Sequence, residues 1–154
     1  KVWPHWFEAQ KRGLIFDVGH GGGSFLFRVA VPATQQGFYP NTISTDLHIG
    51  SMNAGMKDML NVVSKMMNLG MSLQEAITAS TWKPAQVIQR EELGNLSVGA
   101  EADVAIFRMH EGQFGFIDSS GAANKGTKKL ETELTLRAGR IVWDLNGIGA
   151  KIWE

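Results

Sequence analysis

The chain has 154 residues, with 15 Lys and Arg against 15 Asp and Glu, no Cys and a hydrophobic fraction of 44%. This length and composition fit one modest domain or parts of two, and they argue against intrinsic disorder. The balanced charge argues against a nucleic-acid partner, and no apolar run approaches the roughly 18 residues of a membrane span. We therefore expect a protein that binds neither nucleic acid nor membrane, and the absence of cysteine agrees with a cytoplasmic location.

Two further features concern the chain as a whole. Because there is no cysteine, any metal must be held by His, Asp, Glu or a modified side chain. The chain also begins at Lys1 rather than Met, so we expect it to be a piece of a longer protein.

The first part of the chain predicts two β-loop-α units. In chain order, the expected elements are a helix over 7–12, a strand over 14–18, a helix over 25–36 and a strand over 42–45. Ser24 is a candidate cap for the second helix, in which Pro32 should cause a kink. Short apolar strands that run into glycine-bearing loops are typical of buried parallel strands.

The second part predicts helices followed by strands. The expected elements are helices over 57–69, 72–82 and 85–89, then strands over 102–109, 132–138 and 140–144, with a loop over 111–129. Ser72 and Glu75 have the spacing of a capping box, and Pro84 should interrupt the helix that they begin. Gly139 favours a tight turn between the last two strands.

Ionisable residues follow both predicted parallel strands. The sequence DVGH covers 17–20, and TDLH covers 45–48. Functional groups of parallel α/β folds lie at the carboxyl ends of strands, and residues two apart on an extended strand point the same way. Asp46 and His48 are therefore candidates for one centre, and a carboxylate beside imidazoles suits zinc or a similar divalent ion.

Three ordered segments resemble the amidohydrolase superfamily. They are ASTWKPA at 79–85, GNLSVGAEADVAIF at 94–107 and LTLRAGRIV at 134–142. They are similar to its T-x-N-P-A helix, its G-x-L-x-x-G-x-x-A-D segment and its closing hairpin; Lys83 stands where Asn is usual. FDVGHGGGSF at 16–25 and ISTDLH at 43–48 look most like the dihydroorotase-like amidohydrolase and deacetylase branch.

The resemblance implies an α/β fold, the C-terminal portion of a (β/α)8 TIM-type barrel. Residues 1–93 would hold its last two β/α units, and 94–154 would be part of a small β-sandwich. Asp46 would bind the metal, Zn²⁺ or another divalent ion, and act as general base in cleaving an amide, ester or related C–N bond of a small molecule. We expect the substrate-binding pocket around this position to be lined by His20, Gly21, Gly22, Ser24 and His48.

The family's other metal ligands have no counterparts in this sequence. Its H-x-H pair, bridging lysine and later histidines are absent, and one carboxylate cannot replace the three protein ligands that a catalytic zinc wants. We therefore expect the chain to be inactive alone. The alternative is a non-catalytic remnant that serves as a binding or oligomerisation module, because a partial barrel exposes strand edges through which copies would associate.

Several residues have a structural interpretation beside the functional one. Asp46 would otherwise cap a helix, His48 would bond to a neighbouring loop, and His20 would satisfy backbone groups. The loop 19–23 lacks the Lys-Ser/Thr ending of a phosphate loop, and no G-x-S-x-G nucleophile elbow is present. The methionines between 52 and 71 are better explained by core packing than by an adaptable binding face.

Overall fold

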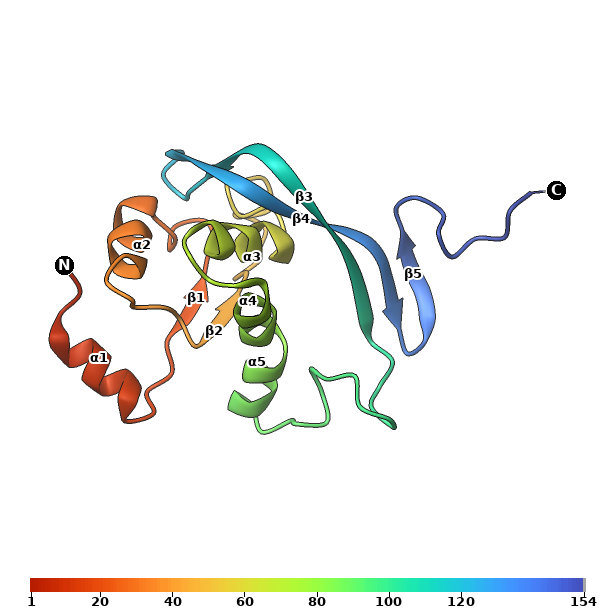
Figure 1. The fold of residues 1–154 in the computed structure, drawn as a ribbon, viewed down its shortest axis with the longest axis horizontal. Helices are drawn as coiled ribbons and strands as arrows, with labels where there is room; N and C mark the ends of the chain where they lie inside the picture. The colour runs from red at the N-terminus through yellow and green to blue at the C-terminus, as the bar shows by residue number, and fades with distance from the viewer. Residues whose placement is uncertain (154) are drawn as a thin grey trace.

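The computed structural model describes residues 1–153, which form a mixed α/β structure (Figure 1). The helices are α1 (Pro4–Lys11), α2 (Phe27–Thr34), α3 (Met59–Asn68), α4 (Leu73–Ser80) and α5 (Trp82–Val87). The strands are β1 (Asp17–Gly19), β2 (Thr42–Ser44), β3 (Val104–Ile117), β4 (Ala123–Arg137) and β5 (Arg140–Asp144).

The strands form two separate sheets. β1 and β2 are parallel, with Val18 opposite Ile43, and β3, β4 and β5 form an antiparallel sheet in that order. In Figure 1 the long β3–β4 ribbon passes over α3, and β5 lies at the end of the molecule far from α1. The two parallel strands end in the same direction, which brings the loops that follow them together.

Helix α3 connects the two sheets through its buried face. Val62, Val63 and Met66 are at most 1% exposed, and they belong to the same core as Ile43 of β2 and Phe116 of β3. Most methionines of the predicted stripe also lie in or against this core, as expected, although Met52 is exposed. The core thus fixes the parallel pair relative to the ribbon.

Two local sequence signals are confirmed, the capping box of α4 and the tight turn between β4 and β5. Ser72 accepts a hydrogen bond from the Glu75 amide, and the Glu75 carboxylate accepts one from the Ser72 amide, which completes the capping box of α4. Gly139, with φ +73°, closes the predicted hairpin between β4 and β5. In both cases the residues that determine the structure are adjacent in sequence.

The predicted start of α2 is wrong. The helix begins at Phe27 rather than at residue 25, and Ser24 does not cap it. The Phe27 amide instead donates to the carboxylate of Asp118, at 2.9 Å. The cap therefore comes from the turn between β3 and β4, far along the chain.

The predicted loop over 111–129 is also wrong. β3 and β4 extend through it, leaving only residues 118–122 as the turn. This stretch is rich in glycine and lysine, but Phe116 is 3% exposed and Phe114 packs against the core. Two aromatic side chains at alternate positions are enough to hold the ribbon on α3.

Two other boundaries differ from expectation. β1 is shorter than the predicted strand and begins at Asp17, since Leu14 and Ile15 lie exposed before it. α5 begins before Pro84 rather than after it. Proline is tolerated there because the first amides of a helix need no intrahelical acceptor.

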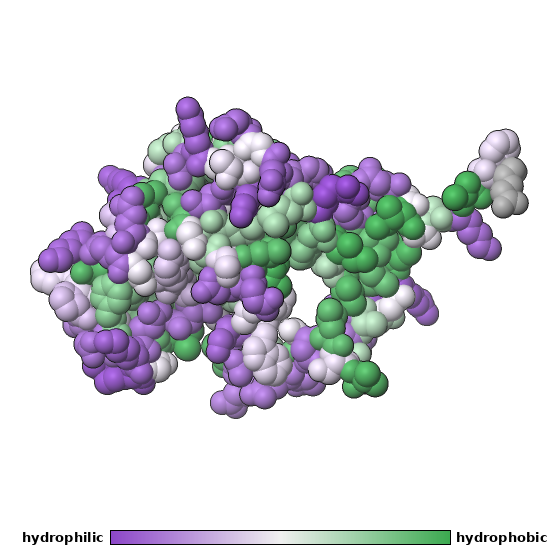
Figure 2. Space-filling view, viewed as in Figure 1, coloured by the Kyte–Doolittle hydropathy of each residue, from purple (hydrophilic) through white to green (hydrophobic). Residues whose placement is uncertain are grey.

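Apolar side chains remain exposed on the β5 side of the molecule. Figure 2 shows green, hydrophobic residues gathered over this end. The large exposed residues here are Ile141, Val142, Trp143, Leu145 and Ile148. Within residues 1–153, no helix has the length and apolar character needed to cross a membrane.

Candidate functional site

The loops after β1 and β2 meet at the carboxyl ends of the two strands. The Gly21 amide donates to the Thr45 carbonyl oxygen at 2.8 Å. Gly21 has φ +48°, and a Cβ at this position would lie 2.4 Å from Oδ2 of Asp46. Only glycine lets the backbone approach the Asp46 carboxylate this closely.

Asp46 has an unusual backbone and a free carboxylate. Its φ is +49°, in the left-handed region that non-glycine residues rarely adopt. The side chain is exposed, and none of the residues in 1–153 donates a hydrogen bond to its carboxylate. Residues held in such conformations cluster at functional sites, and here the turn directs a carboxylate without a partner to the loop after β1.

His20 is completely buried beneath this loop. Its Nδ1 lies 3.0 Å from the Gly21 carbonyl oxygen and its Nε2 lies 2.8 Å from Nζ of Lys65. The ring stacks on Phe25 with a centroid distance of 4.7 Å. Burial lowers the pKa of His20, so the ring is neutral near pH 7. His20 thus contributes to the site through the Gly21 backbone, because both ring nitrogens are engaged.

Lys65 is a site residue that the sequence did not reveal. It is 1% exposed, and its ammonium also contacts the carbonyl oxygens of Gly55 at 2.6 Å and Ile117 at 2.7 Å. Burial lowers the pKa of Lys65 to about 8, while the charge of Asp118 acts to raise it. The sequence signal for it is a lysine among the apolar residues of the methionine-rich helix α3.

Asp118 is a second buried charge that the sequence did not reveal. The carboxylate is 2% exposed and accepts hydrogen bonds from the amides of Phe27, Ser120 and Ala122. Burial alone would raise the pKa of Asp118, but these hydrogen bonds outweigh it and lower the pKa to about 2. The β3–β4 turn is thereby joined to the start of α2.

The remaining predicted site residues lie around the same loops. Nδ1 of His48 accepts a hydrogen bond from the Gly50 amide at 3.1 Å, and Nε2 lies 3.8 Å from the position that a Cβ on Gly22 would take. Ser24 is exposed, and its amide donates to the His20 carbonyl oxygen. The structure therefore brings Gly21 against Asp46 and His48 towards Gly22.

Comparison with known proteins places this chain in a family. Residues 30–142 match the model of the amidohydrolase family. The chain belongs to this family. It is 39% identical over 119 residues to a deacetylase of Brucella anthropi, covering 77% of this chain and 30% of that protein. It is 30% identical over 136 residues to a deacetylase of Enterococcus faecalis, covering 88% of this chain and 37% of that protein.

Solved structures agree with the amidohydrolase assignment. An adenine deaminase superposes with a TM-score of 0.87 at 29% identity, covering 94% of this chain and 39% of that one. A dihydroorotase superposes with a TM-score of 0.80 at 32% identity, covering 91% of this chain and 38% of that one. The chain spans about a third of the length of the curated relatives that it matches.

Amidohydrolase relatives suggest a divalent metal, but the residues of the described chain do not fit one by themselves. Within 1–153, no three His, Asp or Glu side chains come together as a metal would require. His20 cannot complete a set with Asp46, because its Nε2 contacts Lys65 and its Nδ1 contacts Gly21. Among residues 1–153, Asp46 is thus a candidate ligand without a complete set of partners.

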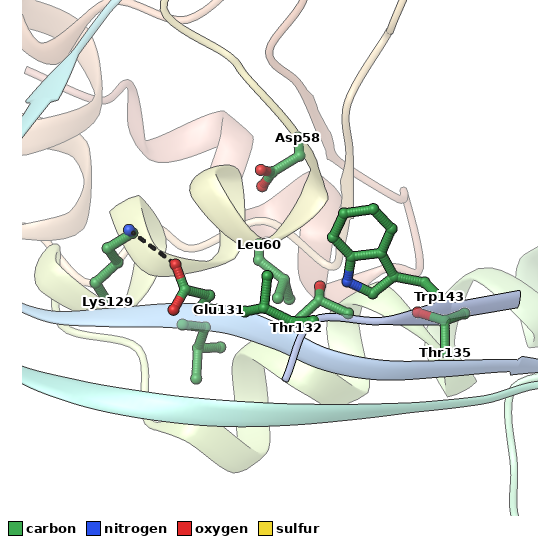
Figure 3. Close-up of a pocket in the computed structure, with 9 residues that line it drawn as sticks. Asp58, Leu60, Lys129, Glu131, Thr132, Thr135 and Trp143 are labelled. Atoms are coloured by element: carbon green, nitrogen blue, oxygen red, sulfur yellow. Dashed lines mark ion pairs between the residues drawn. The ribbon is translucent and has the colours of Figure 1, made fainter. Parts of the chain in front are cut away.

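A cavity of about 360 Å³ lies away from this site, between the start of α3 and strands β4 and β5 (Figure 3). Figure 3 shows Asp58 and Leu60 on one side and Trp143 on another, with the ion pair of Lys129 and Glu131 at its edge. Asp58 is occupied in capping α3. Among residues 1–153, the charged side chains that line this cavity are therefore already engaged.

Proposed function

We propose that this chain is the C-terminal portion of a metal-dependent amidohydrolase that cleaves a C–N or related bond of a small molecule. The observation that carries the proposal is the free carboxylate of Asp46, held in a left-handed turn against Gly21 at the carboxyl ends of β1 and β2. Family membership supports hydrolysis as the reaction. The relatives described as deacetylases favour an acetylated amide or ester as substrate.

Asp46 is the general base in this proposal. Its carboxylate takes a proton from the attacking water, whose oxygen forms a bond to the substrate carbon. The bond to the leaving group then breaks, and Asp46 returns the proton to the leaving nitrogen or oxygen. Both steps need a carboxylate without a competing donor, which is how Asp46 is placed among residues 1–153. The substrate pocket would be lined by Gly21, Gly22, Ser24 and His48.

The chain by itself is inactive in this proposal. Asp46 would be one ligand of Zn²⁺ or another divalent ion in the complete protein, but a catalytic zinc takes about three protein ligands. Residues 1–93 would be the last two β/α units of the barrel, and 94–154 part of the β-sandwich. The parallel pair β1–β2 within 1–93 and the separate antiparallel sheet β3–β5 within 94–154 support this division.

A chimaera tests the proposal. The segment of the Brucella anthropi deacetylase that corresponds to this chain is replaced by this chain, and release of acetate is measured from the compounds that the parent enzyme hydrolyses. We expect the chimaera to bind metal and release acetate, and the isolated chain to do neither. A folded chimaera with full metal content and no hydrolysis would contradict the proposal.

A second candidate function is that of a binding or oligomerisation module. The exposed apolar side chains on the β5 side, together with the free outer edges of β1 and β2, favour association with a second copy. Sedimentation velocity of the isolated chain tests this directly. A concentration-dependent dimer would support it, and a monomer at all concentrations would exclude it.

A further inference from the structure

Three acceptors surround the buried Lys65 ammonium. They are Nε2 of His20, the Gly55 carbonyl oxygen and the Ile117 carbonyl oxygen, at 2.8, 2.6 and 2.7 Å. A charged lysine has three N–H donors and no acceptor. Every donor therefore has one partner, and a buried charge is retained because its hydrogen bonds are complete.

This arrangement determines the tautomer of His20. The Gly21 carbonyl oxygen can only accept, so Nδ1 must carry the proton that reaches it. Nε2 must then be the unprotonated nitrogen that accepts from Lys65, since a proton on both nitrogens would place two cations in contact. The relative basicities agree, because the pKa of Lys65 is about 8 whereas burial lowers that of His20.

The fixed ring in turn holds the Gly21 backbone. Gly21 accepts from Nδ1 of His20 through its carbonyl oxygen and donates to Thr45 through its amide. Its Cα lies against the Asp46 carboxylate, since a Cβ attached to it would come within 2.4 Å of Oδ2. Movement of the His20 ring would therefore displace the backbone that packs against Asp46.

We propose that Lys65 is a positioning residue of the Asp46 site, which fixes the Nδ1–H tautomer of His20 and through it holds Gly21 against the Asp46 carboxylate. The catalytic consequence of this inference rests on the proposed function, in which Asp46 is the general base. Lys65 also joins α3 to the loop before it through Gly55 and to the β3–β4 ribbon through Ile117. The antiparallel sheet thereby supports the site from a distance, through the Lys65 ammonium.

The first test needs no substitution. Long-range ¹H–¹⁵N correlation spectra of the imidazoles in the whole chain report which nitrogen of His20 is protonated. We expect Nδ1 to be protonated and Nε2 to have the resonance of a nitrogen that accepts a hydrogen bond. A proton on Nε2 would overturn the inference, even if Lys65→Met proves unable to fold.

The second test compares Lys65→Met with Lys128→Met, a matched change at an exposed lysine of β4. We expect the Nε2 resonance to shift and amide exchange at Gly21 to accelerate by about tenfold or more in Lys65→Met only. Unchanged Nε2 resonance and Gly21 exchange in a folded Lys65→Met chain would overturn the inference. Neither measurement depends on hydrolysis, so a catalytic role for Asp46 can fail while this positioning role stands.

Discussion

Replacing Gly21 with alanine should have two separable effects. The φ of +48° costs a non-glycine residue about 1–2 kcal/mol. The new Cβ would also lie 2.4 Å from Asp46 Oδ2, but this atom is the end of an exposed side chain that no donor among residues 1–153 holds, so the carboxylate can turn away at little cost. We therefore expect Gly21→Ala to lower the free energy of unfolding by about 1–2 kcal/mol, chiefly through the backbone, and to displace the Asp46 carboxylate.

Two glycines of the same chain separate these effects. Gly37 has φ +78° with nothing within 4 Å of a new Cβ, so Gly37→Ala should show the backbone cost alone. Gly23 has neither constraint, and Gly23→Ala should be close to neutral. Urea denaturation monitored by circular dichroism gives all three values. If Gly21→Ala is as close to neutral as Gly23→Ala, Gly21 does not hold a left-handed conformation and the description of the site is wrong.

Three further predictions concern the supports of the site. Ser72→Ala should lower the free energy of unfolding by about 1 kcal/mol in urea denaturation because α4 loses its capping box, whereas exposed Gln74→Ala should change it little. The free energy of unfolding of the wild type should fall as the pH drops from about 4 towards about 2, because the Asp118 carboxylate has a lower pKa in the folded state than in the unfolded state. Asp118→Asn should lose this part of the pH dependence. An unchanged pH profile in Asp118→Asn would contradict the lowered pKa of Asp118. Asn68→Ala should cost about 2 kcal/mol, because the Asn68 amide group bonds the Thr127 and Lys128 backbone and joins α3 to β4; a thermal melt that matches wild type would refute this.

Short-range features of the fold were predictable from the sequence. The Ser72–Glu75 spacing and the Gly139 turn involve residues within one helical turn or hairpin of each other, and both are confirmed. The extended strand on which Asp46 and His48 were predicted to converge ends at Ser44, and Asp46 has φ +49°. The loops after the two short strands nevertheless meet, with Gly21 against Asp46. That the two loops meet follows from a general rule, namely that loops after neighbouring parallel strands lie at the same edge of the sheet.

Contacts across the chain were not predictable in the same way. The Asp118 carboxylate caps α2 from 91 residues away, so the apparent cap at Ser24 gave the wrong start for the helix. Lys65 contacts His20 across 45 residues, and nothing in the local pattern around either residue indicates the pairing. The left-handed φ of Asp46 was not predictable either, since aspartate tolerates this conformation but does not require it.

The central claim is that Asp46 is the general base, and acetate release by the deacetylase chimaera carrying Asp46→Asn tests it most directly. The matched control is Glu111→Gln, which removes an exposed carboxylate of β3 in the same chimaera. We expect Asp46→Asn to reduce the rate by about a hundredfold or more in a folded protein that keeps the metal content of the control, and Glu111→Gln to leave the rate unchanged. A folded Asp46→Asn chimaera that releases acetate as fast as the Glu111→Gln control would contradict the claim.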